Sequence, residues 1–254
     1  MELGWLHNHA RMWFASIWIF TLRLPWQLGA EFFFRHLIDA DPASNTLSWR
    51  WVAGLHTAGK HYLARAANIR MNTGGRFNPE GDLDERALPL TEDGPTPTPA
   101  PPPAGGTLAT RRVALLLTEE DLHAESWALS AHVAACAALD SPPSAGIPAS
   151  RFTAGALGDG LVRAQAHFGC AAEMLRPDAV VSWAKGLGVT EIVTAYTPVG
   201  RLARDLLTLD GRASMEGLRV VRLQRPFDTR VWPHAKAGFF KLREKIPQLI
   251  AATS

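Results

Sequence analysis

Apolar side chains recur at helical spacing through residues 1–79. Residues 5–22 carry an apolar stripe that predicts a helix, and Pro25 is expected to end it. Residues 31–38 predict a second helix and residues 43–55 a third, with Pro42 where a first helical residue is favoured. Several glycines after the third helix are expected to loosen the chain into a tail. This part of the chain is therefore expected to be helical.

From residue 111 onward, short β-like runs alternate with helical stretches. This alternation predicts βαβ units and a parallel sheet, because parallel strands need a crossover connection. The expected strands cover residues 113–118, 133–139, 172–175, 191–195 and 218–223. The expected helices cover residues 124–131, 153–168, 177–187 and 199–209.

Residues 80–110 separate the two patterns. The run PTPTPAPPPAGG (residues 95–106) is unsuited to a helix or a central strand and is expected to be extended and solvated. We therefore predict a helical domain over residues 1–79, a linker over residues 80–110 and an α/β domain over residues 111–254. The predicted fold class is α plus α/β, with a Rossmann-like parallel sheet in the second domain.

Composition excludes several classes of protein. The 254 residues, of which 47% are hydrophobic and 20% charged, are typical of a globular protein, and the net charge of +2 indicates no strong polyanion-binding surface. The apolar run over residues 12–22 is about half the roughly 20 residues of a membrane span, so no membrane association is expected. Cys136 and Cys170 have neither metal-ligand nor disulfide-framework spacing. We therefore expect no metal and a cytoplasmic location.

Tryptophan is concentrated near the start of the chain, where six of the nine indoles lie in residues 5–51. They surround the segments LHNHARM (residues 6–12) and LIDADPASNTLSWRW (residues 37–51). A plain core favours Leu, Ile and Val, because a buried indole also needs a partner for its N–H. This mixture suits a pocket that stacks on a large flat conjugated ring and hydrogen-bonds its edges. The letters HNH also occur in a class of nucleases, but here His7 and His9 enter an apolar helix on different faces, which disfavours that reading.

These two segments resemble the FAD-binding helical domain of the DNA photolyase/cryptochrome family, whose consensus reads roughly W-hydrophobic-H-N-x-x-R-M and then LIDGDxAxNxxxWQW. The resemblance implies a salt bridge between Arg11 and Asp39 beside the flavin ring. It also implies that Asp41 lies against the flavin and that Asn45 faces its N5 atom, where an amide can accept or donate a hydrogen bond. From the residues alone, the alternatives are an ion pair that joins two helices and an Asn in the first turn of a helix.

The resemblance also assigns electron transfer and substrate contacts. Trp49 and Trp26 match the proximal and middle members of the family's electron-transfer chain, and core packing is the alternative for either ring. Asn8, Met12 and Trp51 match residues that meet a cyclobutane pyrimidine dimer, and the first two share a helix face. The family's (6-4) branch has histidines in place of that Asn and Met, which argues against (6-4) chemistry here.

The second half resembles the family's α/β antenna domain more faintly, through VALLLTEEDLHAESWAL (residues 113–129) and VTEIVTAYTPVGRLARD (residues 189–205). In photolyases this domain comes first, so we interpret the chain as a permuted photolyase-like protein. These residues do not say whether an antenna chromophore binds or which one it is.

The resemblance implies a blue-light flavoprotein, a carbon–carbon lyase in which reduced FAD passes an electron to a pyrimidine dimer in damaged DNA. The family's Arg after the motif's Asn is His9 here, which slightly favours the alternative of a cryptochrome-like sensor without repair activity. A truncated, non-catalytic remnant is a third possibility. No Ser/Thr/Gly-rich run precedes Arg11 to hold the FAD phosphates. The chain alone is therefore expected to lose FAD on gel filtration and to associate through exposed apolar surface.

Overall fold

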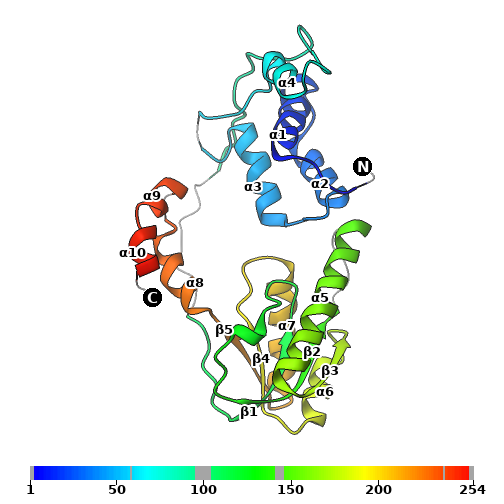
Figure 1. The fold of residues 1–254 in the computed structure, drawn as a ribbon, viewed down its shortest axis with the longest axis vertical. Coiled ribbons are helices and arrows are strands. Elements are labelled where there is room, and N and C mark those ends of the chain that lie inside the picture. The colour runs from blue at the N-terminus through cyan, green and yellow to red at the C-terminus, as the bar shows by residue number, and fades with distance from the viewer. Residues whose placement is uncertain (1–2, 58, 95–103, 141–145, 237, 252–254) are drawn as a thin grey trace. The chain divides into compact units, whose positions relative to one another are not determined.

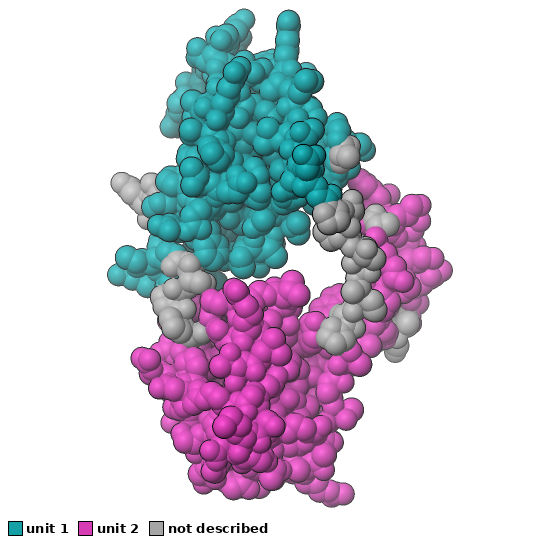
Figure 2. Space-filling model, turned by 180° about the vertical axis from the view of Figure 1, so that it is seen from behind, with its two compact units in different colours: residues 1–95, 143–152 teal, residues 96–142, 153–254 magenta. Residues whose placement is uncertain are grey.

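The computed structural model describes residues 3–57, 59–94, 104–140, 146–236 and 238–251. It divides into two compact units, shown in different colours in Figure 2. The helical unit comprises Met1–Pro95 with Pro143–Phe152, and the sheet unit comprises Thr96–Pro142 with Thr153–Ser254. Most of the proline-rich run predicted to be extended, residues 95–103, lies outside the described residues.

The helical unit begins with α1 (Asn8–Ser16), the π-helical turn η1 (Ile17–Thr21), α2 (Trp26–His36), α3 (Pro42–Ala53) and α4 (Ala66–Asn72) (Figure 1). The first predicted helix is shorter than expected, because the His7 side chain accepts a hydrogen bond from the His9 N–H and caps the helix there. The second begins directly after Pro25, five residues earlier than expected. The third helix agrees with the prediction, whereas α4 was missed.

The core of the helical unit is formed by α1, η1, α2 and α3. Its buried residues are Ala15, Ile19, Phe20, Ala30, Phe33, Leu37, Trp49, Val52 and Ala53. The chain after α4 returns to this core, where Leu90 N–H donates to the carbonyl of Ala53 over 2.9 Å. Arg50 and Glu92 form an ion pair at 2.6 Å beside this contact. The segment around residues 90–92 is thus held against α3 by both a backbone bond and an ion pair.

The sheet unit contains five strands, all parallel, in the order β3-β2-β1-β4-β5 (Figure 1). The strands are β1 (Arg112–Leu117), β2 (His132–Leu139), β3 (Ala171–Leu175), β4 (Glu191–Ala195) and β5 (Arg219–Leu223). The predicted parallel sheet is confirmed. The order places β1 at the centre and reverses direction between β1 and β4, so a crevice is expected outside the carboxyl ends of those two strands.

Both faces of the sheet are covered by helices, as all-parallel sheets require. One face packs on α6 (Val180–Gly186) and α7 (Arg201–Met215), and the other packs on α5 (Ile147–Phe168). The α6–α7 face includes the buried strand residues Ala114, Leu116 and Ile192. The α5 face includes Val113, Leu115 and Leu117. Alternate residues of β1 therefore enter opposite cores, which explains its continuous apolar sequence.

The helix predicted for residues 124–131 is wrong. Only the short 3₁₀ turn η2 (Ala124–Ser126) forms there. Trp127, which follows it, is extended, and both Trp127 and Leu129 pack against the core on the α5 face. Side chains two positions apart share a face only in an extended chain, so this packing favours extended backbone over a helix.

Glu191, at the start of β4, is a buried carboxylate with 2% exposure. It accepts hydrogen bonds from the Ala109 and Thr110 N–H groups at 3.0 and 3.1 Å, and it forms an ion pair with Arg219 of β5. Burial raises the pKa of Glu191, but the hydrogen bonds from Arg219 and Thr110 outweigh burial and bring the pKa below its ordinary value. This carboxylate joins the segment before β1 to β4 and β5.

The chain ends in the short helices α8 (Pro226–Val231), η3 (Trp232–His234), α9 (Phe239–Arg243) and α10 (Ile246–Ala251). Among the described residues, none of the helices has the length and apolar character needed to cross a bilayer.

Candidate functional site

The helical unit contains a cavity of about 550 Å³, a size typical of ligand sites. Its walls come from α1, α2, the turn between α2 and α3, and α3 itself. The lining residues are Asn8, Arg11, Met12, Ala15, Phe33, Phe34, Leu37, Asp39, Ala40, Asp41, Ser44, Asn45, Leu47, Ser48, Trp49, Trp51, Val52 and His56. Eight of the ten residues that the sequence assigned to a site line this one cavity, and the exceptions are His9 and Trp26.

Arg11 and Asp39 form the charged pair of the cavity. The Arg11 Nη1 donates to Asp39 Oδ2 over 2.6 Å, as the sequence predicts, and its Nε donates to the Leu6 carbonyl over 2.8 Å. Two acceptors therefore fix the plane of the guanidinium. The Arg11 side chain is 26% exposed and Asp39 is 56% exposed, so the pair contributes little to stability but remains open to a ligand.

Asp41 and Asn45 lie one turn apart at the start of α3. Asp41 caps the helix, since its Oδ1 accepts from the Ser44 N–H over 2.5 Å. The Asn45 Nδ2 donates to the Ala30 carbonyl of α2 over 2.7 Å. That bond fixes the carboxamide, and the carbonyl oxygen is the group that Asn45 can offer to a ligand. Ala30 was not part of the sequence prediction, because a backbone carbonyl leaves no residue-type signal.

Trp49 forms the floor of the cavity, with 2% exposure. It packs between Phe33, at a centroid distance of 5.1 Å, and Trp18, at 6.4 Å. Gly29 of α2 lies directly against the ring, where a Cβ atom would stand 2.2 Å from Cη2 of the indole. The Trp49 Nε1–H is buried and has no hydrogen-bond partner in the described part of the chain. A buried donor without an acceptor is costly to the stability of the folded state.

The two tryptophans that the sequence assigned to electron transfer have different surroundings, although Trp26 packs against the core that contains Trp49. Trp26 lies under the Arg50 guanidinium at 5.7 Å and lines a different groove. The indole that contacts Trp49 is Trp18, whose Nε1–H donates to the Pro25 carbonyl over 2.9 Å. Sequence reasoning missed Trp18, although its place three residues after the buried Ala15 could have marked it as core-facing.

The residues expected to meet DNA lie at the mouth of the cavity, with one exception. Asn8 and Met12 share a face of α1, and the Asn8 Nδ2 lies 3.9 Å from the Met12 Sδ. Trp51 is 40% exposed and stacks on Tyr62. His9 is exposed and does not line the cavity, since its ring stacks on Trp13 at 6.2 Å.

A second hollow, of about 470 Å³, lies in the sheet unit at the crevice that the strand order predicts. Its walls come from the loops after β1 and β4 and from the segment after β5, including Tyr196 and Trp232, which meet edge to face at 5.2 Å. Asp228 also lines it, and burial and the nearby Asp121 raise the pKa of Asp228 despite the opposing effect of Arg225.

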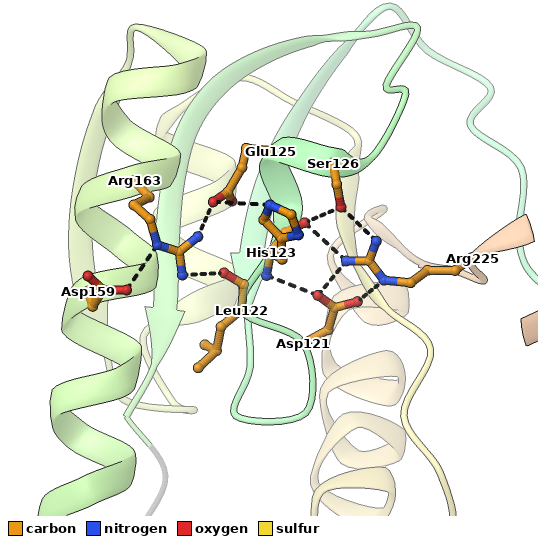
Figure 3. A network of polar contacts seen from close by, with 8 residues as sticks. All are labelled: Asp121, Leu122, His123, Glu125, Ser126, Asp159, Arg163 and Arg225. Atoms are coloured by element: carbon orange, nitrogen blue, oxygen red, sulfur yellow. Dashed lines mark hydrogen bonds and ion pairs between the residues drawn. The ribbon is translucent and has the colours of Figure 1, made fainter. Parts of the chain in front are cut away.

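Figure 3 shows the polar network that builds this crevice. Arg225 donates to both oxygens of Asp121, at 2.7 and 2.8 Å, and to the Ser126 hydroxyl at 2.6 Å. Burial raises the pKa of Asp121, but Arg225 outweighs burial and holds the pKa below its usual value. Arg163 of α5 joins Glu125 to the Leu122 carbonyl. Both arginines bind the loop after β1, and of the two only Arg225 also lines the crevice.

The fold and the cavity define a class, namely a helical domain that can hold a flat aromatic cofactor between charged and indole side chains. Residues 1–102 match the family model described as the FAD binding domain of DNA photolyase. The chain is similar to the deoxyribodipyrimidine photo-lyase of Vibrio cholerae, with 36% identity over 88 residues, which cover 35% of this chain and 18% of that protein. The match to the photo-lyase of Streptomyces griseus is 42% over 79 residues, or 31% of this chain and 17% of the relative.

Cryptochromes also match. Cryptochrome-2 of Arabidopsis thaliana is 35% identical over 86 residues, which cover 34% of this chain and 14% of that protein. No solved structure matches the chain at a significant level. The comparisons thus support the photolyase/cryptochrome family for residues 1–102, while the chain spans 18% or less of the length of these relatives.

Proposed function

We propose that this chain is a photolyase/cryptochrome-like flavoprotein whose helical unit holds the ring of FAD in the 550 Å³ cavity. The observation that supports it most is that the Arg11–Asp39 pair and Asn45 line one cavity together with the indole of Trp49. An aromatic floor, one oriented guanidinium and one oriented carboxamide fit a flat ring with polar edges. When bound, FAD would supply blue-light absorption and one-electron chemistry.

Three polar side chains of the cavity would have separate roles toward the ring. Arg11, oriented by Asp39, would stabilise negative charge at a carbonyl edge. Asn45 would offer its carboxamide oxygen, because its amide nitrogen is held by Ala30. Asp41 keeps the start of α3 in place through its cap on Ser44. These roles are positioning and electrostatic, which is how a protein adjusts a cofactor.

Trp49 would serve as the first electron donor inside the protein. An oxidised Trp49 could be reduced by Trp18, the indole whose ring lies 6.4 Å from its own. The Trp18 Nε1–H donates to the Pro25 carbonyl oxygen, which can stabilise positive charge on the oxidised indole. Trp18 is half-buried and therefore within reach of a reductant from solvent.

For the substrate, we propose a pyrimidine dimer in damaged DNA, approached through Asn8, Met12 and Trp51 at the cavity mouth. One observation favours the second candidate, a blue-light sensor without repair activity. His9, which replaces an arginine of the family motif, stacks on Trp13 outside the cavity and adds no fixed positive charge at its mouth. Incubation with a dimer-containing oligonucleotide under blue light separates the two, since only repair restores the absorbance of the pyrimidines near 260 nm.

We further propose that the protein acts in the cytoplasm. We also propose that the sheet unit is the family's α/β domain in permuted order. Its crevice between β1 and β4 would be the site of an antenna chromophore, if one binds. The strand order β3-β2-β1-β4-β5 and the aromatic walls of the crevice support this assignment. Chromophore extraction from the purified protein, followed by mass spectrometry, tests it.

The cavity assignment is tested by flavin titration of the purified 254-residue chain. Of the described residues that line the cavity, Arg11 is the only Lys or Arg, so the ring should dominate binding. We expect FAD and lumiflavin, which lacks phosphates, to bind within about tenfold of each other and both to be lost on gel filtration. Stoichiometric FAD retained after gel filtration would show that phosphate contacts outside this cavity hold the cofactor.

Two variants sharpen this experiment. Arg11→Ala removes a charge-assisted contact worth roughly 1.5–3 kcal/mol and is expected to weaken flavin binding about tenfold or more. The matched control is Arg35→Ala, because Arg35 forms an ion pair with Glu31 at the same 2.6 Å but lies outside the cavity lining. Equal affinities for the two variants would refute the assignment of the ring to this cavity.

A further inference from the structure

The two cysteines, which are 34 positions apart in the sequence, meet in the sheet unit. Cys136 lies in β2, and Cys170 lies in the turn that leads into β3, the neighbouring strand. Their Sγ atoms are 3.3 Å apart, and both cysteines are free thiols. Both side chains face the core on the α5 side of the sheet. The fold has therefore brought the two sulfurs into contact without joining them.

We infer that Cys136 and Cys170 form an oxidative modification site, at which a peroxide or a small-molecule disulfide converts the two thiols into an intramolecular disulfide. The sulfurs must approach from 3.3 Å to about 2.05 Å, a movement of roughly 1.3 Å. Cys170 can supply it, because it follows Gly169, whose φ of +62° belongs to the turn after α5. Cys136 is held in the ladder between β1 and β3 and is the fixed partner.

The two thiols differ in access, and this difference sets the order of the reaction. Cys136 has no exposed surface, whereas Cys170 is half-buried and open to a small oxidant. A peroxide would oxidise the Cys170 thiol to a sulfenic acid and release one water. The Cys136 sulfur would then attack the Cys170 sulfur, and the departing hydroxide with the Cys136 proton would form a second water. Two thiols and one peroxide thus give one disulfide and two waters.

The environment of Cys136 controls the rate of the second step, the closure of the disulfide. Burial, and then the neighbouring Cys170 thiol, raise the pKa of Cys136 above its ordinary value. The thiolate is the reactive form, so closure is expected to be slow compared with a surface dithiol. The same burial protects Cys136 from direct oxidation, and the 3.3 Å contact between the two sulfurs favours closure over further oxidation of Cys170.

A disulfide here would act on the edge of the sheet. Strand β3 is the terminal strand on its side and pairs with β2, and the crosslink would join β2 to the start of β3 and close a loop that contains α5. An unprotected edge strand is the part of a sheet that detaches or pairs with another chain most readily. Oxidation is therefore expected to stabilise the sheet unit against local opening at β3.

The test treats the folded 254-residue chain with hydrogen peroxide and, separately, with oxidised glutathione, and follows the intact mass. The expected product has lost two hydrogens, with one peptide that joins Cys136 to Cys170 after proteolysis without reductant. The thermal midpoint of the sheet unit should rise by roughly 5 °C and return after reduction. A protein that keeps both thiols free, or that forms only intermolecular disulfides, would overturn the inference.

Cys136→Ala is the matched variant, because it leaves Cys170 equally exposed but without a partner. Its Cys170 should carry glutathione or proceed to sulfinic acid, whereas the wild-type protein should show little of either. Equal adduct formation in the two proteins would also overturn the inference. If this variant does not fold, blocking Cys170 of the wild-type protein with N-ethylmaleimide before oxidation serves the same purpose and should abolish the mass loss.

Discussion

Gly29 is the position where a single methyl group tests the packing of the candidate site. An ideal Cβ atom on Gly29 would lie 2.2 Å from Cη2 and 2.5 Å from Cζ3 of Trp49. Carbon atoms pack at about 3.5–4.0 Å, so the indole would have to move by more than about 1 Å. It cannot move freely, because Phe33 and Trp18 contact its other faces. We therefore expect Gly29→Ala to push Trp49 towards the cavity.

The magnitude follows from two opposing contributions. Replacing a glycine in the interior of a helix with alanine gains about 1 kcal/mol from helix propensity. Overpacking a rigid ring costs about 1–3 kcal/mol, and the 2.2 Å approach places this substitution at the upper end. The expected net effect is a loss of about 1–2 kcal/mol in the free energy of unfolding of the helical unit.

Urea unfolding followed by tryptophan fluorescence measures this loss, since six of the nine tryptophans lie within residues 5–51. The control is Gly211→Ala in α7, where a Cβ atom would meet nothing within 4 Å and the substitution should stabilise the sheet unit by about 1 kcal/mol. In a Trp49→Phe background the smaller ring leaves room, so Gly29→Ala should lose most of its cost. A Gly29→Ala protein as stable as the wild type, or an equal loss in both backgrounds, would refute the proposed contact.

Three further predictions concern charge and electron transfer. Because folding lowers the pKa of Glu191, the stabilisation from this carboxylate is present above the unfolded pKa of about 4.3 and is lost as pH falls through the folded pKa. The free energy of unfolding should therefore fall less steeply with decreasing pH in Glu191→Gln than in the wild type. Equal slopes in the two proteins would contradict this. Arg225→Ala should destabilise the sheet unit by about 2 kcal/mol in thermal or urea unfolding, because it leaves the half-buried Asp121 unpaired; a loss below about 0.5 kcal/mol would mean that solvent replaces the arginine. In flavin-loaded protein under blue light with a reductant, Trp18→Phe should slow bleaching of the visible absorbance more than Trp26→Phe, and the reverse order would restore Trp26 as the inner partner of Trp49.

Much of the secondary structure follows from the sequence alone. The parallel strands were predictable because each is a short apolar run between helical stretches, and periodicity is a local property of the chain. The start of α3 was predictable from Asp41 and Pro42, which are a cap and a first-turn residue by their own chemistry. The presence of Arg11 and Asp39 in one cavity was also predictable, but only from the resemblance of two motifs to a known family.

The contacts between elements were decided by the tertiary structure. Residue type alone does not distinguish Trp18 from Trp26, and only the packing shows that Trp18 contacts Trp49. The sequence does not mark Gly29 as a packing position, and only the fold shows that an indole lies against it.

Residues 124–131 have a helix-compatible composition, but the core on the α5 face takes Trp127 and Leu129 from an extended chain. Cys136 and Cys170, separated by a whole helix, come into contact because β2 and β3 are neighbours in the sheet. Local sequence specifies which elements form, whereas side-chain contacts depend on how distant segments fill shared space, and no periodicity in the chain records that.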